Sequence, residues 1–246
     1  MAFQRFPTRN LQLQIAEEIA SRIFRGIYPP GTILPNEFEW VKTFDVSRTA
    51  LREALRLLTA KGMIDSRPRR GTIVRDKADW TTLDADMLRW MQHVMPTAEF
   101  VSHVMTMRRI IEPEAAALCA TRSTAHQVAE LRVLAETIDQ LGQRLDNALT
   151  ADVGFHRLIL VASGNPLLAG LAACIEEALK ATIALTMLSA GGRERTDARW
   201  RAAMAGHCAV VDAIEQRSAA GARTAMQDLL AVTEEDVRAV LAEKQM

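Results

Sequence analysis

Hydrophobic residues recur along this chain at helical spacing through most of its length. In residues 11–26 they fall every three or four positions, which predicts an amphipathic helix ending at Gly26. From about residue 84 onwards the same period continues, with no alternating, strand-like pattern. This part is predicted to be an all-α bundle of six or seven helices. The helical segments lie at about 84–95, 97–121, 124–146, 148–163, 165–188, 194–217 and 218–243.

Residues 36–74 follow a different pattern, which predicts two short helices and then a hairpin. Asn36, with Glu39 three residues later, fits the capping box that starts a helix. Ser47 is a good N-cap for the second helix, and Gly62 ends it. Strand-like residues then lie on both sides of a short basic turn. The order of elements predicts a helix-turn-helix followed by a small β-hairpin.

The second of these helices carries an arginine at every fourth residue. The arginines share one face, because residues four apart are neighbours on a helix, and leucines occupy the opposite face. A helix with an apolar back and a basic front, followed by a basic hairpin, fits a DNA groove; the alternative is a solvated charged face. The arginines are Arg48, Arg52 and Arg56, and the leucines are Leu51, Leu55 and Leu58.

The charge of the chain is divided between its two parts. The whole chain has 30 basic and 30 acidic residues, so its net charge of zero gives no hint of a polyanionic partner. Residues 1–75, however, contain 13 Lys and Arg against 7 Asp and Glu, a net of +6, and the remainder has a net of −6. This asymmetry indicates that the N-terminal part faces nucleic acid and that the C-terminal part has another task.

Cysteine usage and hydropathy indicate a cytoplasmic protein. Cys119, Cys174 and Cys208 are widely spaced and form no CxxC pair, which favours reduced, buried thiols. The N-terminus lacks the apolar segment of a signal peptide. No window approaches the roughly 18 continuous apolar residues of a membrane span, so no membrane partner is expected.

The N-terminal part contains three strings in a fixed order: IYPPGTILPNEFEW, VSRTALREALRLL and GTIV. In these strings, residues 1–75 resemble the winged helix-turn-helix domain of the GntR family of bacterial repressors. The resemblance implies three helices and a small hairpin, with the second helix of the motif in a DNA major groove. Arg48 is then expected to read a guanine bidentately, and Arg52 to hold the DNA backbone. The implied DNA-binding residues are Ser47, Arg48, Thr49, Arg52, Arg69, Arg70 and Gly71.

Two positions depart from the family pattern. Phe38 and Arg69 stand where many members of the family have Arg and Gly. The mode of DNA binding therefore follows from the resemblance, whereas the operator sequence does not.

The C-terminal part contains the strings MRRIIEPEAAALCA, ADVGFHRLILVASGNPLL and HCAVVDAI. In these strings, residues 85–246 resemble the FCD ligand-binding domain of the FadR subfamily, which implies an effector-binding and dimerisation domain. Residues 76–84 are interpreted as the linker between the two domains. The segment RGTIVRDKADWTTLDADMLRWM is most similar to repressors of sugar-acid catabolism, those of the galactonate operon in particular.

A metal site is one interpretation of the C-terminal part. Asp152 and His156 lie four residues apart, so they share one helix face and could bind one metal ion. The FCD resemblance adds His207 as a ligand, and this set suits Zn²⁺, Ni²⁺ or a similar divalent ion. The family's usual fourth ligand would fall at Leu229, which cannot ligate, so water or an effector carboxylate would complete the shell. The alternative is that the three side chains hydrogen-bond the effector or one another.

Arg108 matches, by the same resemblance, an arginine that points into the effector cavity of the family. An inward guanidinium would pair bidentately with a carboxylate. The alternative is a structural ion pair with a buried acid. The implied effector-binding residues are Arg108, Asp152, His156 and His207.

The predicted function is that of a non-enzymatic transcriptional repressor which binds a palindromic operator as a homodimer. Two recognition helices about one DNA turn apart read two half-sites. A sugar acid or related small carboxylate would bind the C-terminal domain and release the DNA. Two alternatives are a metal-independent regulator that senses acyl-CoA or another small acid, and a metal-dependent hydrolase built on Asp152, His156 and His207.

Overall fold

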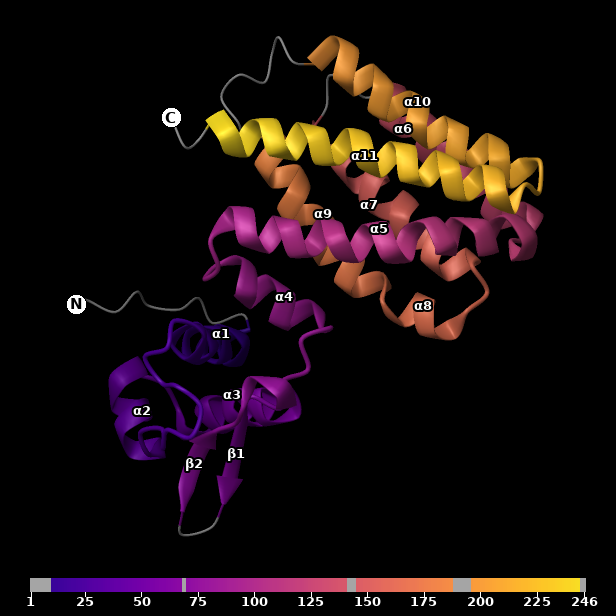
Figure 1. Ribbon diagram of the computed structural model, residues 1–246. Coiled ribbons are helices and arrows are strands. Elements are labelled where there is room, and N and C mark those ends of the chain that lie inside the picture. The colour runs from indigo at the N-terminus through magenta and orange to yellow at the C-terminus, as the bar shows by residue number, and fades with distance from the viewer. Residues whose placement is uncertain (1–9, 68–69, 141–144, 188–195, 244–246) are drawn as a thin grey trace. The chain divides into compact units, whose positions relative to one another are not determined.

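The computed structural model describes residues 10–67, 70–140, 145–187 and 196–243 (Figure 1). The chain divides into two compact units, Met1–Met95 and Pro96–Met246. Each unit has its own hydrophobic core. None of the described helices is both long and apolar enough to cross a membrane.

The first unit contains the predicted helix-turn-helix and hairpin, which confirms the winged-helix expectation. Its elements are α1 (Leu11–Phe24), α2 (Glu37–Phe44), α3 (Arg48–Ala60), β1 (Ile64–Arg67), β2 (Gly71–Val74), the 3₁₀ turn η1 (Lys77–Asp79) and α4 (Ala85–Gln92). The two strands pair antiparallel with Ile64 opposite Val74. An isolated bridge joins Ile33, ahead of α2, to Ile73 of β2. The segment before the helix-turn-helix is thereby attached to the hairpin.

The helix-turn-helix forms where the caps predict it. The side chain of Asn36 accepts a hydrogen bond from the Glu39 amide at 3.0 Å, and the Glu39 carboxylate accepts one from the Asn36 amide at 2.8 Å. The predicted capping box is therefore present. Asp45 turns the chain in a left-handed conformation, with φ 52°. Ser47 Oγ then accepts a hydrogen bond from the Ala50 amide at 3.1 Å and caps α3.

The core of the first unit explains the apolar face of α3. Leu51 and Leu58 are fully buried, and Leu55 is half-buried. Trp40 and Phe44 of α2 stack with ring centroids 4.8 Å apart. Burying a leucine side chain fully is worth roughly 1.5–3 kcal/mol, so the leucine face fixes which side of α3 remains exposed.

The segment that follows the hairpin is attached to the end of α3. Gly62 has φ 72°, and a Cβ at this position would lie 2.3 Å from the carbonyl oxygen of Asp79, so a side chain cannot be accommodated. The Thr81 amide donates to the Lys61 carbonyl at 2.9 Å. The Lys61 ammonium donates to Asp84 Oδ1 at 2.5 Å. These contacts hold the chain close to α3 as far as the start of α4.

The division between the units differs from the expected domain boundary. The sequence predicts a linker at 76–84 and a second domain from residue 85. In the structure α4 packs on α1, and Met87 and Trp90, both fully buried, belong to the core of the first unit. The first unit accordingly extends to residue 95.

The second unit is all-α in its described residues, as predicted, and contains seven helices there. These are α5 (Thr97–Arg122), α6 (Ala125–Gln140), α7 (Leu145–Ala162), α8 (Pro166–Gly170), α9 (Ala172–Met187), α10 (Thr196–Glu215) and α11 (Ala219–Glu243). The helix predicted at 165–188 is two helices, because the chain leaves the helical path after Gly170. The break between the helices predicted at 165–188 and 194–217 lies outside the described residues.

The helices of the second unit surround a core to which α7 contributes Phe155, Ile159 and Leu160, all fully buried. α7 packs against α5, α6 and α9, and the long helices α5 and α11 run side by side (Figure 1). α10 packs on α11, α6 and α5. This arrangement brings α5, α7 and α10, which are far apart in the sequence, to one polar cluster.

Candidate functional site

The exposed start of α3 collects four of the predicted DNA-binding residues. Ser47, Arg48 and Thr49 form its cap and first turn, Arg52 follows one turn later, and all four are exposed. Ser47 Oγ uses a lone pair to accept from Ala50, so its own hydrogen can still be donated outward. The structure thus brings these four residues together at the exposed start of α3.

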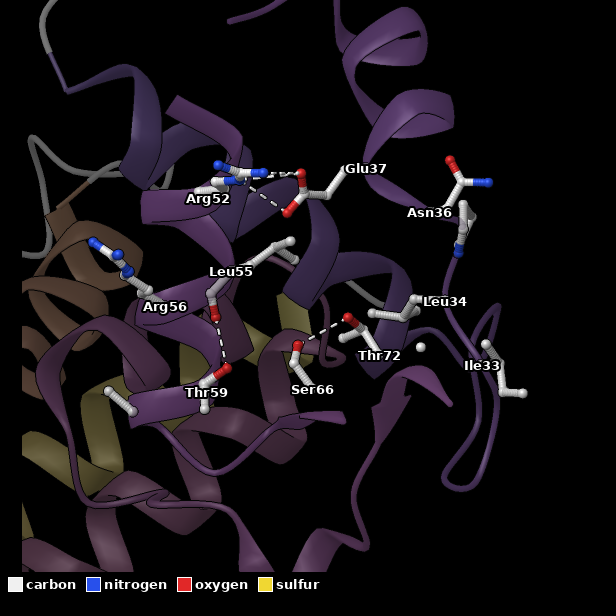
Figure 2. Close-up of a pocket in the computed structure, with 13 residues that line it drawn as sticks. Ile33, Leu34, Asn36, Glu37, Arg52, Leu55, Arg56, Thr59, Ser66 and Thr72 are labelled. Carbon is white, nitrogen blue, oxygen red and sulfur yellow. Dashed lines mark hydrogen bonds and ion pairs between the residues drawn. The ribbon is translucent and has the colours of Figure 1, made fainter. Parts of the chain in front are cut away.

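Arg52 is held by an acid that the sequence reasoning did not single out. Its Nε lies 3.1 Å from both carboxylate oxygens of Glu37, on α2 (Figure 2). This hydrogen bond and the charge of Glu37 raise the pKa of Arg52. Glu37 directly follows the N-cap Asn36, and that position could have indicated it, since acids are favoured in a first helical turn.

The hairpin contributes its own basic turn. Arg70 and Gly71 are exposed, and Gly71 adopts φ 83°, a conformation that favours glycine. The Arg70 amide donates to the Arg67 carbonyl at 3.1 Å and closes the turn. Arg69 lies outside the described residues.

The second cluster combines the residues predicted to bind metal or effector. His207 Nε2 lies 2.8 Å from Asp152 Oδ1, and His156 Nε2 lies 3.7 Å from the same oxygen. Both histidines are buried, and the Asp152 side chain is 19% exposed. The Phe155 ring packs edge-on against both imidazoles. Two helices, α7 and α10, therefore converge on one small polar site.

The acids of this cluster remain charged. Burial alone raises the pKa of Asp152, but the hydrogen bond from His207 and the charge of His156 lower it to about 2. Burial likewise raises the pKa of Glu112, and the charges of Arg108 and His156 lower it to about 2. Two buried carboxylates are thus stabilised by the cations and imidazoles around them.

Arg108 forms the ion pair that was the alternative to an effector contact. Arg108 Nε donates to Glu112 Oε1 at 2.6 Å, and both side chains are almost fully buried. Arg108 Nη2 also lies 3.3 Å from His156 Nε2. The guanidinium therefore borders the Asp152–histidine cluster while its Nε is held by Glu112.

Glu112 is the buried acid of this ion pair, and its second contact was not predicted from the sequence. Its Oε2 lies 2.6 Å from His156 Nδ1, in addition to the contact with Arg108. The spacing of four residues from Arg108 indicates the ion pair, because i, i+4 residues of opposite charge pair on one face. It does not indicate the contact with His156 on α7.

The donor set fits a divalent metal ion with three protein ligands. One ligand atom each from Asp152, His156 and His207 lies within 4.8 Å of the others. Ligand atoms about 2.1 Å from a tetrahedral ion are about 3.4 Å apart, so small side-chain rotations would complete the geometry. Leu229 is buried and has no donor atom for a fourth bond. Such a set leaves a coordination position for water or a ligand.

Comparisons with known proteins agree with both units. The model described as "Bacterial regulatory proteins, gntR family" matches residues 11–74, and that of the FCD domain matches residues 103–232. The HTH-type transcriptional regulator YieP of Escherichia coli (strain K12) is 37% identical over 90% of this chain and 93% of its own length. The galactonate operon transcriptional repressor of the same organism is 27% identical over 91% and 95%.

Solved structures share the fold. A GntR protein of Streptococcus agalactiae superposes with a TM-score of 0.50 at 25% identity, covering 90% of this chain and 97% of that one. Lar, described as controlling the agr system of Listeria monocytogenes, has a TM-score of 0.62 at 16% identity, covering 96% and 99%.

The fold and the exposed basic helix therefore define a winged-helix, DNA-binding transcriptional regulator with an all-α second domain. The chain belongs to the gntR family of bacterial regulatory proteins, and its second unit carries an FCD domain. The matched domains and relatives are those of transcription regulators rather than of enzymes.

Proposed function

We propose that the protein is a repressor of an operon for the catabolism of a sugar acid or related small carboxylate, and that this acid releases it from a palindromic operator. The observation that carries the proposal is the buried polar cluster of Arg108, Asp152, His156 and His207 in the second unit of a DNA-binding regulator. The similarity to the galactonate operon transcriptional repressor supports this class of effector, and the 29% identity to NanR repressors supports the role of repressor.

On the DNA side, the face at the start of α3 enters the major groove of a half-site. Arg48 donates bidentately to a guanine, and Ser47 and Thr49 contact phosphates or base edges. Arg52 contacts the backbone, as do Arg69, Arg70 and Gly71 of the hairpin. A homodimer brings two such faces to two half-sites about one DNA turn apart.

On the effector side, Asp152, His156 and His207 would hold a divalent ion such as Zn²⁺ or Ni²⁺. The ion would supply a position to which a carboxylate and a neighbouring hydroxyl can bind. Arg108 pairs with the carboxylate through its Nη1, since its Nε and Nη2 both donate to Glu112. A charged, polar ligand of this kind suits a site lined by a guanidinium and two imidazoles, and an acyl chain does not.

A metal-independent mode is the second candidate, favoured by the 2.8 Å contact between His207 and Asp152. Here the same residues hydrogen-bond the acid directly. In both modes the acid shifts the DNA-binding equilibrium only to the extent that it binds one state of the protein more tightly than the other.

The test is thermal unfolding of the purified protein with a panel of sugar acids, with and without chelator. A ligand that binds only the folded state stabilises it by RT ln(1 + [L]/Kd). Stabilisation by at least one hydroxy-acid, lost in Arg108→Met, supports the proposal. Loss on chelation identifies the metal-dependent mode, and persistence identifies the metal-independent one. If no hydroxy-acid raises the melting temperature, the proposed effector class is wrong.

A further inference from the structure

The buried polar cluster of the second unit is almost closed to solvent. Arg108, Glu112, His156 and His207 are each at most 3% exposed, and the Asp152 side chain is 19% exposed. In the protein interior a charge that lacks a counter-charge is costly, because the dielectric constant is low. The number of negative charges that a ligand can bring into this cluster therefore follows from the charges already present.

The charge of Arg108 is already balanced. Its Nε donates to Glu112 Oε1 at 2.6 Å, and its Nη2 donates to Glu112 Oε2 at 3.4 Å. The guanidinium and this carboxylate together carry no net charge. Arg108 can therefore donate a hydrogen bond to an effector through Nη1, but it adds no uncompensated positive charge to the cluster.

Asp152 sets the charge of the remaining part of the cluster. Side chains that ligate a metal ion are deprotonated, so the imidazoles of His156 and His207 would be neutral and Asp152 would carry one negative charge. Asp152 thereby balances one of the two positive charges of a divalent ion held by these three residues. Leu229, where a fourth ligand is lacking, is apolar and buried. One positive charge is left for the effector.

A second anionic group of a ligand would find no buried cation. Among the second-unit side chains whose exposure is described, every arginine and lysine other than Arg108 is exposed or half-buried. Two of them are held by acids on the surface: Arg132 by Asp212 and Glu215, and Arg223 by Glu114. Within this part of the unit, a second carboxylate next to the cluster would be buried without a counter-charge.

We propose that the cluster selects a hydroxy-acid with a single carboxylate over the corresponding diacid, and that Glu112 sets this selectivity by cancelling the charge of Arg108. The one negative charge of a monocarboxylate balances the one positive charge that is left. A diacid brings a second charge that the interior does not balance, and a neutral polyol leaves the positive charge unbalanced. The inference rests on the metal-dependent mode of the proposed function.

The test is isothermal titration calorimetry of the full chain loaded with Zn²⁺. The ligands are two series in which a polyol, its monocarboxylate and its dicarboxylate share one carbon chain: galactitol, galactonate and galactarate, and threitol, threonate and tartrate. The short series keeps the second carboxylate close to the first. The monocarboxylate should bind most tightly in a series, and the dicarboxylate at least about 100-fold more weakly, because a buried charge without a partner loses its hydration.

Two variants change the charge of the cluster in opposite directions. Glu112→Gln leaves the charge of Arg108 unbalanced, so the affinity for the dicarboxylate relative to the monocarboxylate should rise by at least about tenfold. Adding Arg108→Met removes that charge, so the ratio should return to the wild-type value although both ligands lose the guanidinium hydrogen bond. Glu114→Gln, at an exposed position of the same helix, is the matched control and should leave the ratio unchanged. Circular dichroism selects a temperature at which each variant is folded.

The outcomes separate the inference from the proposal on which it rests. If the wild type binds dicarboxylate and monocarboxylate equally well, or if Glu112→Gln has the same ratio as Glu114→Gln, the charge selectivity is wrong but the class of effector stands. If a chelator leaves monocarboxylate binding unchanged, the ion does not belong in the charge balance, and the inference fails while the metal-independent mode remains. If no hydroxy-acid binds the wild type, the proposed effector class fails and the inference fails with it.

Discussion

Glu112 Oε2 lies 2.6 Å from His156 Nδ1, in the interior of the second unit. Because a carboxylate can only accept, Nδ1 carries the hydrogen, and the lone pair of a neutral imidazole is on Nε2, 3.7 Å from Asp152. Carboxylates in this position orient metal-binding histidines and fix their tautomer. The same Glu112 holds Arg108. One buried acid thus sets the geometry of a predicted metal ligand and of a predicted effector contact.

Glu112→Gln is expected to destabilise the protein strongly. The amide oxygen can still accept from His156, but the Arg108 charge is left buried without its counter-charge. Breaking a buried ion pair in this way costs about 3–5 kcal/mol of unfolding free energy. Adding Arg108→Met should recover part of the loss, since the buried cation is then gone. Urea denaturation of the single and double variants measures both effects.

Glu114→Gln is the control for this prediction. Glu114 lies two residues away, is exposed and pairs with Arg223 at the surface, where ion pairs contribute little. Equal unfolding free energies for Glu112→Gln and Glu114→Gln would contradict the stabilising role of the buried pair.

The fold could be predicted well because its signals are local. The capping box of Asn36, the N-cap Ser47 and the leucine face of α3 each depend on residues a few positions apart. The end of the first unit could not be predicted in the same way. The helical period predicts that α4 has an apolar side, but it does not specify which helix that side covers. In the structure Met87 and Trp90 of α4 pack into the core of the first unit.

The Asp152–histidine cluster could likewise be predicted only in part from the sequence. Asp152 and His156 could be paired from their spacing on one helix, whereas His207 came from the family resemblance because it lies on α10. The contact of Glu112 with His156 was missed because it joins α5 to α7 across 44 positions of sequence. Glu37 was missed for a similar reason, since its pairing with Arg52 joins α2 to α3.

Lys61 is expected to make the first unit less stable at high pH. Burial alone lowers the pKa of Lys61, but the hydrogen bonds from Lys61 to Asp84 and Asp86 outweigh burial and raise it. Because the pKa of Lys61 is higher in the folded state than in the unfolded state, the protonated lysine stabilises the folded state. This stabilisation is complete below the ordinary lysine pKa, about 10.4, and it is lost as the pH rises through the pKa of the folded state. Lys61→Met should therefore be less stable than the wild type at pH 8, with a difference that shrinks above about pH 10.5.

Chemical denaturation at a series of pH values measures this difference. Lys42→Met, at an exposed position of α2, serves as the control for loss of a lysine charge. A difference between wild type and Lys61→Met that stays constant up to the alkaline limit would show that Lys61 acts by packing instead, for example against the Trp90 ring.

Cys119 is expected to resist thiol reagents in the folded protein. Burial raises the pKa of its thiol to about 11, with the nearby Ser123 and Arg217 opposing the shift, so little thiolate exists at neutral pH. Titration with a chromogenic disulfide near pH 8 should leave Cys119 unmodified until denaturant is added. Peptide mapping identifies the site, and rapid native labelling of Cys119 would show that α5 opens in solution.

Leu229→His is expected to strengthen metal binding by the second unit. A Cβ on Gly206 would lie 2.9 Å from a Leu229 methyl carbon, so residue 229 packs against the neighbour of His207. An imidazole here adds a fourth ligand to Asp152, His156 and His207. Because outer-shell partners alone are worth about 10–100-fold in metal affinity, a direct ligand should contribute at least about tenfold. Competition with a chelating dye for Zn²⁺ and Ni²⁺ measures the gain.

The Leu229→His variant is also expected to lose stability when metal is absent, which makes the test specific. Without metal, a buried imidazole in place of Leu229 should lower stability by about 1–3 kcal/mol, and metal should restore it. Leu229→Asn is the matched control, being similar in size and polar but a poor ligand for these ions. Melting temperatures with and without chelator should therefore diverge for Leu229→His and stay together for Leu229→Asn. An equal metal response in the two variants would mean that residue 229 does not face the Asp152–histidine cluster.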